Sequence, residues 1–164
     1  MSLLGSLFGR RPALTPQLAA RLAAWQALPL PRQDSPFANS RFVVVDVESS
    51  GLNIHRDHLI AIGAVAVSNG QIQLADSLEI VLQQDRVSEK ENILIHGIGG
   101  TAQREGIPAP EALLRFLDYL GKDPLVAFHV AFDESMISRA MKRFLGLNFR
   151  HAWADLAYVA PALH

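Results

Sequence analysis

The sequence predicts an α/β domain with a mixed sheet, in which a three-stranded antiparallel meander is followed by parallel strands and flanking helices. Three observations predict this class. Residues 42–47 form a valine-rich apolar run that ends in a Ser-Ser-Gly turn, which is typical of a buried strand. Asn69-Gly70 separates two further apolar runs, 59–67 and 71–82, and is a strong hairpin signal. Beyond residue 108, helical stripes alternate with short apolar runs, which favours parallel strands.

Composition limits the classes of protein that the chain can represent. With 164 residues, 49% of them hydrophobic, it is long enough for one globular domain with a sizeable core. A net charge of −1 gives no global basic field, although a local grip on a nucleic-acid strand end stays possible where metal offsets the phosphate charge. The absence of cysteine excludes disulfides, thiolate zinc sites and cysteine nucleophiles. No apolar run approaches 18 residues, so no membrane span is expected, and a cytoplasmic location is the default.

Residues 1–40 are predicted to form an N-terminal helix and linker ahead of the main domain at 41–164. Thr15 is a suitable helix cap, with Pro16 at the first helical position. The apolar residues of this helix form one stripe at helical spacing: Leu18, Leu22, Trp25 and Leu28. Two roles are open for the stripe, which either packs on the domain or docks to a partner protein.

The remaining elements follow the meander in chain order. Residues 83–91 are predicted to be a polar crossing, and 93–100 an apolar, glycine-rich stretch. The expected elements after them are a short polar helix through Glu105, a helix from Pro110 to Gly121, a strand at 125–128, a helix ending near Gly146, a strand at 153–154 and the start of a helix at 156–163.

Two acidic residues stand near the end of the first predicted strand. Because side chains alternate along a strand, Asp46 and Glu48 share one face with Val44. The opposite face then carries Val43, Val45 and Val47. Two neighbouring carboxylates at a buried strand end repel each other and lose solvation. Mg²⁺ or Mn²⁺ is the usual relief, because these ions prefer hard oxygen ligands. The alternative is a solvated strand end without a ligand.

A third acidic residue, Asp133, falls in the first turn of a predicted helix just after a short buried strand. An acid at this position is favoured by the helix dipole alone. In a doubly wound sheet, however, the turns from strand to helix beside the central strand lie over the ligand site. Asp133 therefore either serves only its helix end or reaches the metal held by Asp46 and Glu48.

Three blocks of sequence, in this order and spacing, resemble the DEDDh family of 3′–5′ exonucleases: Val45 to Leu52, His96-Gly97-Ile98, and Leu125 to Asp133. The nearest branch is that of the proofreading epsilon subunit of bacterial DNA polymerase III. The resemblance covers about residues 41–164 and implies a ribonuclease H-like fold, which agrees with the predicted order of strands and helices. It implies a nucleic-acid 3′ end as the ligand, with DNA favoured over RNA. A protein partner such as a polymerase is one expectation, with the N-terminal helix as its contact surface if the stripe does not pack on the domain.

The resemblance also implies roles for the acidic residues. Asp46 would bridge two Mg²⁺ or Mn²⁺ ions, Glu48 would help to hold one of them, and Asp133 would support the other directly or through water. In such two-metal chemistry, one ion lowers the pKa of the attacking water and the other stabilises the leaving 3′ oxygen. Asp155 matches a family aspartate that is not a metal ligand, so it is assigned no catalytic role.

Six residues are implied to bind the substrate: Ser49, Ser50, Gly51, Leu52, His96 and His129. The backbone at Ser49 and Ser50 would lie against the terminal nucleotide. His96 would either shape the pocket edge or serve as a structural histidine in a turn. His129 stands where the family commonly has asparagine, and we expect a core or hydrogen-bonded histidine there in preference to a ligand.

The last motif of the family, a histidine followed five residues later by an aspartate, is absent from the sequence. It supplies the general base and the fourth carboxylate. The chain is thus either a segment of a longer protein, as its unfinished last helix favours, or a natural short form, and we expect feeble activity from these 164 residues alone. The leading function is a metal-dependent exonuclease domain. The alternatives are a non-catalytic module that binds nucleic acid or metal, and an interaction domain that uses the N-terminal helix.

Overall fold

The computed structural model describes residues 14–32 and 36–163; the first 13 residues of the predicted N-terminal segment lie outside this part of the chain. The elements, in chain order, are α1 (Pro16–Gln26), β1 (Arg41–Ser49), β2 (Leu59–Ser68), β3 (Gln71–Val81), α2 (Lys90–His96), α3 (Gly100–Arg104), α4 (Ala109–Leu120), β4 (Leu125–Ala127), α5 (Val130–Ala140), β5 (Trp153–Asp155) and α6 (Leu156–Val159). Single turns of 3₁₀ or π helix occur at Phe37–Asn39, Met141–Leu145 and Ala160–Leu163. No helix in these described ranges is long and apolar enough to cross a membrane.

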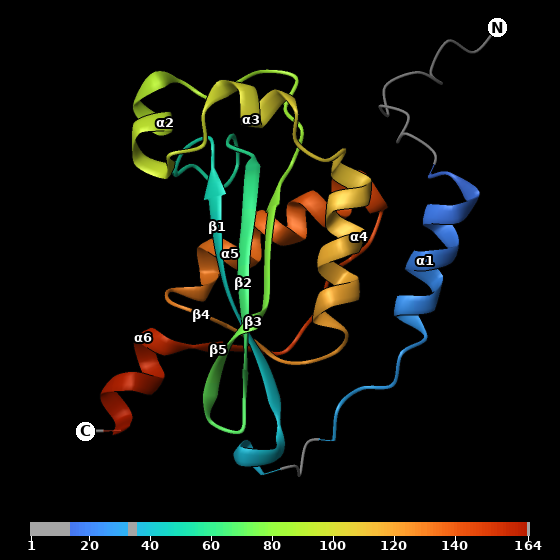
Figure 1. Ribbon diagram of the computed structural model, residues 1–164, viewed down its shortest axis with the longest axis vertical. Coiled ribbons are helices and arrows are strands. Elements are labelled where there is room, and N and C mark those ends of the chain that lie inside the picture. The colour runs from blue at the N-terminus through green and yellow to red at the C-terminus, as the bar shows by residue number, and fades with distance from the viewer. Residues whose placement is uncertain (1–13, 33–35, 164) are drawn as a thin grey trace, which may run out of the picture.

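The five strands form one mixed sheet in the order β3-β2-β1-β4-β5 (Figure 1). β1, β2 and β3 are antiparallel neighbours, whereas β4 pairs in parallel with both β1 and β5. Between β2 and β3, Asn69 and Gly70 have φ values of 54° and 71°. Positive φ at both central positions is the requirement of the tight hairpin turn that Asn-Gly favours. The predicted meander with added parallel strands is confirmed.

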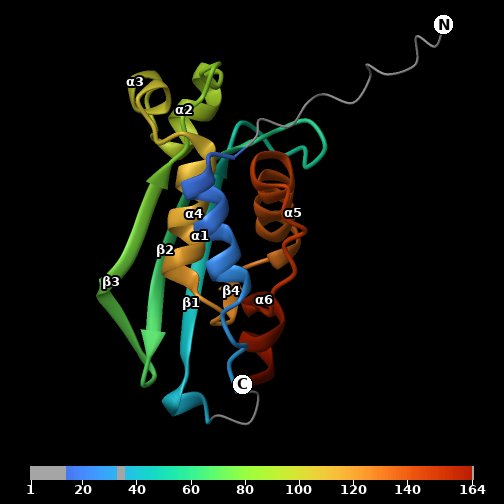
Figure 2. The same ribbon diagram turned by 90° about the vertical axis from the view of Figure 1, so that its right-hand side faces the viewer.

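The hydrophobic core lies between one face of this sheet and the helices α4 and α5 (Figure 2). From β1 it receives the three alternate valines Val43, Val45 and Val47. From α4 it receives seven buried residues: Ala109, Ala112, Leu113, Leu114, Phe116, Leu117 and Leu120. From α5 it receives Met136, Ile137 and Ala140, which are buried. The pleat of β1 therefore leaves its other face, with Asp46 and Glu48, outside this core.

The N-terminal helix α1 packs against α4 (Figure 2). Thr15 caps it as predicted, because its Oγ1 accepts a hydrogen bond of 3.3 Å from the backbone N–H of Leu18. Trp25 is buried in the core, and its Nε1 donates to the carbonyl of Gly121 over 2.7 Å. The prediction that the apolar stripe packs on the domain is confirmed for Leu18, Leu22 and Trp25. Leu28 is 44% exposed and does not extend the stripe, because α1 ends at Gln26.

Ion pairs add to this contact. Arg21 of α1 lies 2.6 Å from a carboxylate oxygen of Glu111 and 2.5 Å from one of Asp118, both on α4. The side chains of all three are partly exposed, so solvent screens the pairs and each adds little to stability. The apolar contact of Trp25 therefore contributes more to the docking of α1 than its charges do.

The region between β3 and α4 departs from the prediction, because it contains the helix α2 where a polar crossing and a glycine-rich stretch were expected. α2 ends at His96, and Gly97 follows it with a φ of 73°, a common way to terminate a helix. Leu94 and Ile95 are 75% and 82% exposed. The helix was missed because its apolar residues do not face a core, so no stripe at helical spacing marks it.

Candidate active site

Asp46 and Glu48 lie on the open face of the sheet, as predicted. Asp46 is exposed and Glu48 is partly buried, and both line a groove of about 530 Å³. His96, the last residue of α2, and Ile98 just beyond it form part of the same groove. On β2 the residue opposite Asp46 is Gly63, which has no side chain. The space above the sheet next to the Asp46 carboxylate is therefore left open.

Asp133 comes to this part of β1 from the first turn of α5. Its side chain is only 5% exposed, and its Oδ1 accepts a hydrogen bond of 3.1 Å from the backbone N–H of Val47. Val47 is the residue between Asp46 and Glu48. The structure thus brings the third predicted acid against the strand segment that carries the other two.

Two of the three carboxyl groups, those of Glu48 and Asp133, have raised pKa values. Burial raises the pKa of Asp133 to about 6, with a further contribution from the negative charge of Asp46. Burial also raises the pKa of Glu48, again with a contribution from Asp46, while His96 partly offsets the shift. A bound divalent cation stabilises the ionised form of carboxylates whose ionisation is otherwise disfavoured.

The chemistry of these donors fits Mg²⁺ or Mn²⁺, because all three are hard carboxylate oxygens. Their spacing is looser than that of a finished metal site: within residues 14–32 and 36–163, no three His, Cys, Asp or Glu side chains are grouped closely enough to hold an ion. One Asp133 oxygen already accepts a hydrogen bond from the backbone of β1. The identity and number of the ions stay predictions.

The turn that leads into α5 is held by Asp155. Its Oδ1 accepts hydrogen bonds from the backbone N–H groups of His129 (3.0 Å) and Ala157 (2.9 Å), and its Oδ2 accepts one from Val130 (3.1 Å). Although desolvation opposes the shift, these hydrogen bonds lower the pKa of the Asp155 carboxyl. Asp155 therefore fixes the start of the helix that carries Asp133, a contact that no pattern in the sequence predicts.

His129 differs from the expectation of a core histidine. Its side chain is exposed, and its ring lies 4.5 Å from that of Phe128 in an edge-on arrangement. The backbone of His129 has a φ of 61°, a left-handed conformation that non-glycine residues rarely adopt. This conformation directs the ring away from the core. The hydrogen-bonded group is the backbone N–H, and a role for the ring in binding substrate stays a prediction.

The loop after β1 combines a fixed turn with a free apolar tip. The Ser50 hydroxyl donates to Asp57 Oδ1 over 3.1 Å, and the Ser49 hydroxyl donates to the carbonyl of Gly51 over 2.6 Å. A Cβ atom on Gly51 would lie 2.5 Å from Asp57 Oδ2, so a larger residue would require the Asp57 carboxylate to move. Leu52, in contrast, is 88% exposed. An ordered turn just after β1 thus presents one exposed apolar side chain.

Two distant residues hold this loop from outside. The Arg139 guanidinium on α5 donates to the carbonyls of Ile54, His55 and Asp57, the last two over 3.1 and 3.0 Å. The Asn92 amide on α2 donates to the carbonyl of Ser50. Neither contact has a signal in the sequence, since the partners lie 82 to 85 and 42 residues apart.

His96 is both a turn residue and part of the groove. Its Nδ1 accepts a hydrogen bond of 3.0 Å from the backbone N–H of Ile98, so in the neutral ring Nε2 carries the proton and donates to the Ser88 hydroxyl at 3.2 Å. Both ring nitrogens are engaged, which fixes the ring at the edge of the groove. The structural role that the sequence left open is thus present.

Comparison with known proteins places this arrangement among nucleases. The model of the Exonuclease family, RNase_T, matches residues 43–160. A DNA polymerase III PolC-type protein of Thermotoga petrophila is 31% identical over 130 residues, which are 79% of this chain and 9% of that protein. The DNA polymerase III subunit epsilon of Buchnera aphidicola is 27% identical over 103 residues, 60% of this chain and 42% of that protein. The chain thus spans less than a tenth of the PolC-type relatives.

Solved structures share the fold. Exonuclease I without ligand has a TM-score of 0.62 at 18% identity, and exonuclease I with the inhibitor BCBP has 0.65 at 17%; each match covers 76% of this chain and 30% of the other. Identity this low supports a common fold and no more. The ribonuclease H-like architecture that the resemblance implied is therefore confirmed.

Proposed function

This chain belongs to the Exonuclease (RNase_T) family, and on that premise we propose that it is a metal-dependent 3′–5′ exonuclease domain that releases nucleotides from nucleic-acid 3′ ends. One observation carries the proposal. The buried Asp133 carboxylate accepts a hydrogen bond from Val47, between Asp46 and Glu48, so α5 adds a third acid to the end of β1.

Asp46, Glu48 and Asp133 are the residues that would hold the two divalent ions, Mg²⁺ or Mn²⁺. When bound, such ions supply a water of lowered pKa and stabilise negative charge on the leaving 3′ oxygen. The raised pKa values of Glu48 and Asp133 support this assignment, because burial and the charge of Asp46 disfavour their ionised forms, which a bound cation would stabilise.

Other residues orient the substrate. The hydroxyls of Ser49 and Ser50 are hydrogen-bonded within the loop, and the backbone N–H of Ser50 donates to the carbonyl of His58 over 3.0 Å, so this segment offers a fixed surface for the terminal nucleotide. Leu52 projects from this loop and provides an apolar contact for a base. His96 forms the edge of the groove, and the exposed ring of His129 lies at the start of α5, beside the same strand ends.

The substrate and partner are inferred from the relatives. Several matching proteins are DNA polymerase III chains, which favours DNA over RNA and a polymerase as the protein partner. The buried side of α1 is occupied by α4, so a partner would contact its exposed side. A cytoplasmic location stays a prediction.

The proposal is tested with a single DNA strand labelled at its 5′ end. The natural gene product that contains this chain should shorten it stepwise from the 3′ end in the presence of Mg²⁺. Asp46→Asn should slow shortening by about 100-fold or more, because loss of an ion removes several kcal/mol of transition-state stabilisation. Glu79→Gln, a change in the same groove, is the matched control and should retain activity. Tight binding of the strand without Mg²⁺-dependent shortening would instead favour the non-catalytic module.

A further inference from the structure

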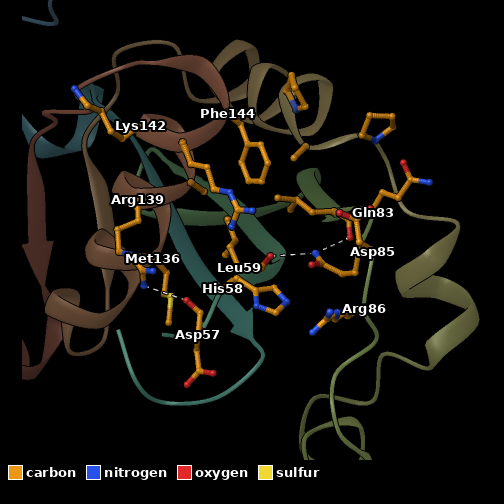
Figure 3. Close-up of a pocket in the computed structure, with 17 residues that line it drawn as sticks. Asp57, His58, Leu59, Gln83, Asp85, Arg86, Met136, Arg139, Lys142 and Phe144 are labelled. Atoms are coloured by element: carbon orange, nitrogen blue, oxygen red, sulfur yellow. Dashed lines mark hydrogen bonds between the residues drawn. The ribbon is translucent and has the colours of Figure 1, made fainter. Parts of the chain in front are cut away.

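A second pocket, of about 770 Å³, lies apart from the carboxylates, and neither Asp46, Glu48 nor Asp133 lines it (Figure 3). Five segments that are distant in sequence form its wall: 57–59, 82–86, 108–110, 136–140 on α5, and 142–144 in the π-helical turn. Its volume falls within the range of ligand pockets, about 300–1,000 Å³.

The floor of this pocket is apolar. Five of its residues are buried members of the core: Leu59, Leu82, Ala109, Met136 and Ala140. The ring of Phe144 points into the space above them (Figure 3). The Gln84 amide is already engaged, because it donates to the carbonyls of Leu59 and Leu82 over 3.2 and 3.0 Å. The floor therefore offers apolar contact to a ligand.

The rim, in contrast, is basic. Its four cations are Arg86, Arg139, Lys142 and Arg143, against the two carboxylates of Asp57 and Asp85. Within the part of the chain that the structure describes, none of these four cations makes an ion pair. Arg139 binds backbone carbonyls, and Lys142 binds the amide oxygen of Asn148 over 2.6 Å. These acceptors are neutral, and the four cations outnumber the two carboxylates of the pocket.

His58 on the same wall responds to this charge. Burial lowers its pKa, Asp57 opposes the shift, and Arg143 and Arg139 lower the pKa further. The whole chain has a net charge of −1, so the positive field belongs to this pocket and not to the protein as a whole.

We propose that this basic pocket binds an acidic peptide segment of a partner protein, with one large apolar side chain of that segment on the floor. Arginine side chains at the rim match carboxylates in charge and in geometry. Nucleic acid is also anionic, but the floor is mainly aliphatic. The guanidinium of Arg143 also already lies over the Phe144 ring, 5.0 Å from its centre, where a base would otherwise stack. The peptide is therefore the better match.

Fluorescence anisotropy with the labelled, amidated peptide Gly-Asp-Glu-Phe-Glu-Asp-Gly tests the proposal. Arg143→Gln is expected to raise its Kd by about tenfold, since a charged contact is lost. Arg150→Gln removes the same charge at an exposed position outside the pocket and should change the Kd by less than about twofold. Arg86→Gln repeats the test on the other wall, and melting temperatures show that each variant is folded.

The probe itself tests the two halves of the pocket. Replacing its Phe by Ser should weaken binding by about tenfold through lost apolar contact, and replacing its acids by Asn and Gln should abolish binding. Equal affinity in the wild type and in Arg143→Gln would overturn the proposal, as would no binding at about 1 mM peptide. The proposal would also be overturned if a labelled oligothymidylate bound in an Arg143-dependent way while the peptide did not bind. Asp46, Glu48 and Asp133 do not line this pocket, so a failure of peptide binding leaves the proposed nuclease function untouched.

Discussion

The two faces of β1 differ in what they contribute to the protein. Val45 is buried in the core beneath α4 and α5, whereas its neighbour Asp46 is exposed in the groove on the other side. A fully buried valine stabilises a fold by about 1.5–3 kcal/mol. The raised pKa of Asp133, beside the same strand, means that its ionised form opposes folding at neutral pH. The pleat of one strand thus separates the residues that stabilise the domain from those that carry its chemistry.

The largest expected change in the free energy of unfolding comes from a substitution in the hydrophobic core. Leu113→Ala on α4 removes a fully buried side chain and should lower the free energy of unfolding by about 2–5 kcal/mol, measured by urea denaturation. Mn²⁺ affinity, measured well below the melting temperature, should stay within about twofold of wild type because stability and metal affinity are distinct. A large loss of Mn²⁺ affinity in the folded variant would show that the two faces are coupled.

A substitution at the carboxylate site should instead raise the free energy of unfolding. Asp133→Asn keeps an acceptor for the Val47 N–H but carries no charge, so it should stabilise the metal-free protein at pH 7 by up to about 3 kcal/mol. The folded pKa of Asp133, about 6, lies above its ordinary value of 3.8. Its contribution to stability is therefore full below about pH 4 and is lost as the pH rises through 6.

The difference in stability between wild type and Asp133→Asn, measured in EDTA from pH 4 to 8, should therefore grow with pH and level off above about 7. Glu134→Gln, the neighbouring position on α5, is the control and should follow the wild-type profile. A variant that is less stable than wild type at pH 7 would contradict this account of the carboxylate group.

A smaller change in the free energy of unfolding is expected from a substitution at the turn into α5. Asp155→Asn replaces one acceptor oxygen by an amide group that cannot accept from the backbone, so at least one N–H among His129, Val130 and Ala157 loses its partner. The free energy of unfolding should fall by about 1–2 kcal/mol. Hydrogen exchange should quicken first at Val130, which would place the loss at this turn. Faster exchange spread evenly over the sheet would argue against a local clamp.

Local patterns in the sequence predicted much of the fold. The alternation of Val and acidic residues along β1, the Asn69-Gly70 turn and the stripe of α4 each arise from neighbours within one element. α2 was missed because it is short and exposes Leu94 and Ile95, so no buried stripe reveals it. The resemblance to a family brought Asp133 together with Asp46 and Glu48 before any geometry was known.

Contacts between distant segments were beyond the sequence. The hydrogen bond from Val47 to Asp133 spans 86 residues, and Arg139 reaches the loop at 54–57 across more than 80. The basic pocket is likewise built from five separate segments, each unremarkable alone. Such sites depend on how helices pack against the sheet, which periodicity within a single element does not specify.

The most direct test of the central claim is the binding of Mn²⁺, measured by calorimetry in the wild type, Asp46→Asn and Glu79→Gln. On β3, Glu79 is opposite Gly63, which itself is opposite Asp46, so both acids lie in one row of the same groove. Asp46→Asn should lose binding by about 100-fold or more, while Glu79→Gln should stay within about threefold of the wild type. Unchanged Mn²⁺ affinity in Asp46→Asn would contradict a metal site at the end of β1.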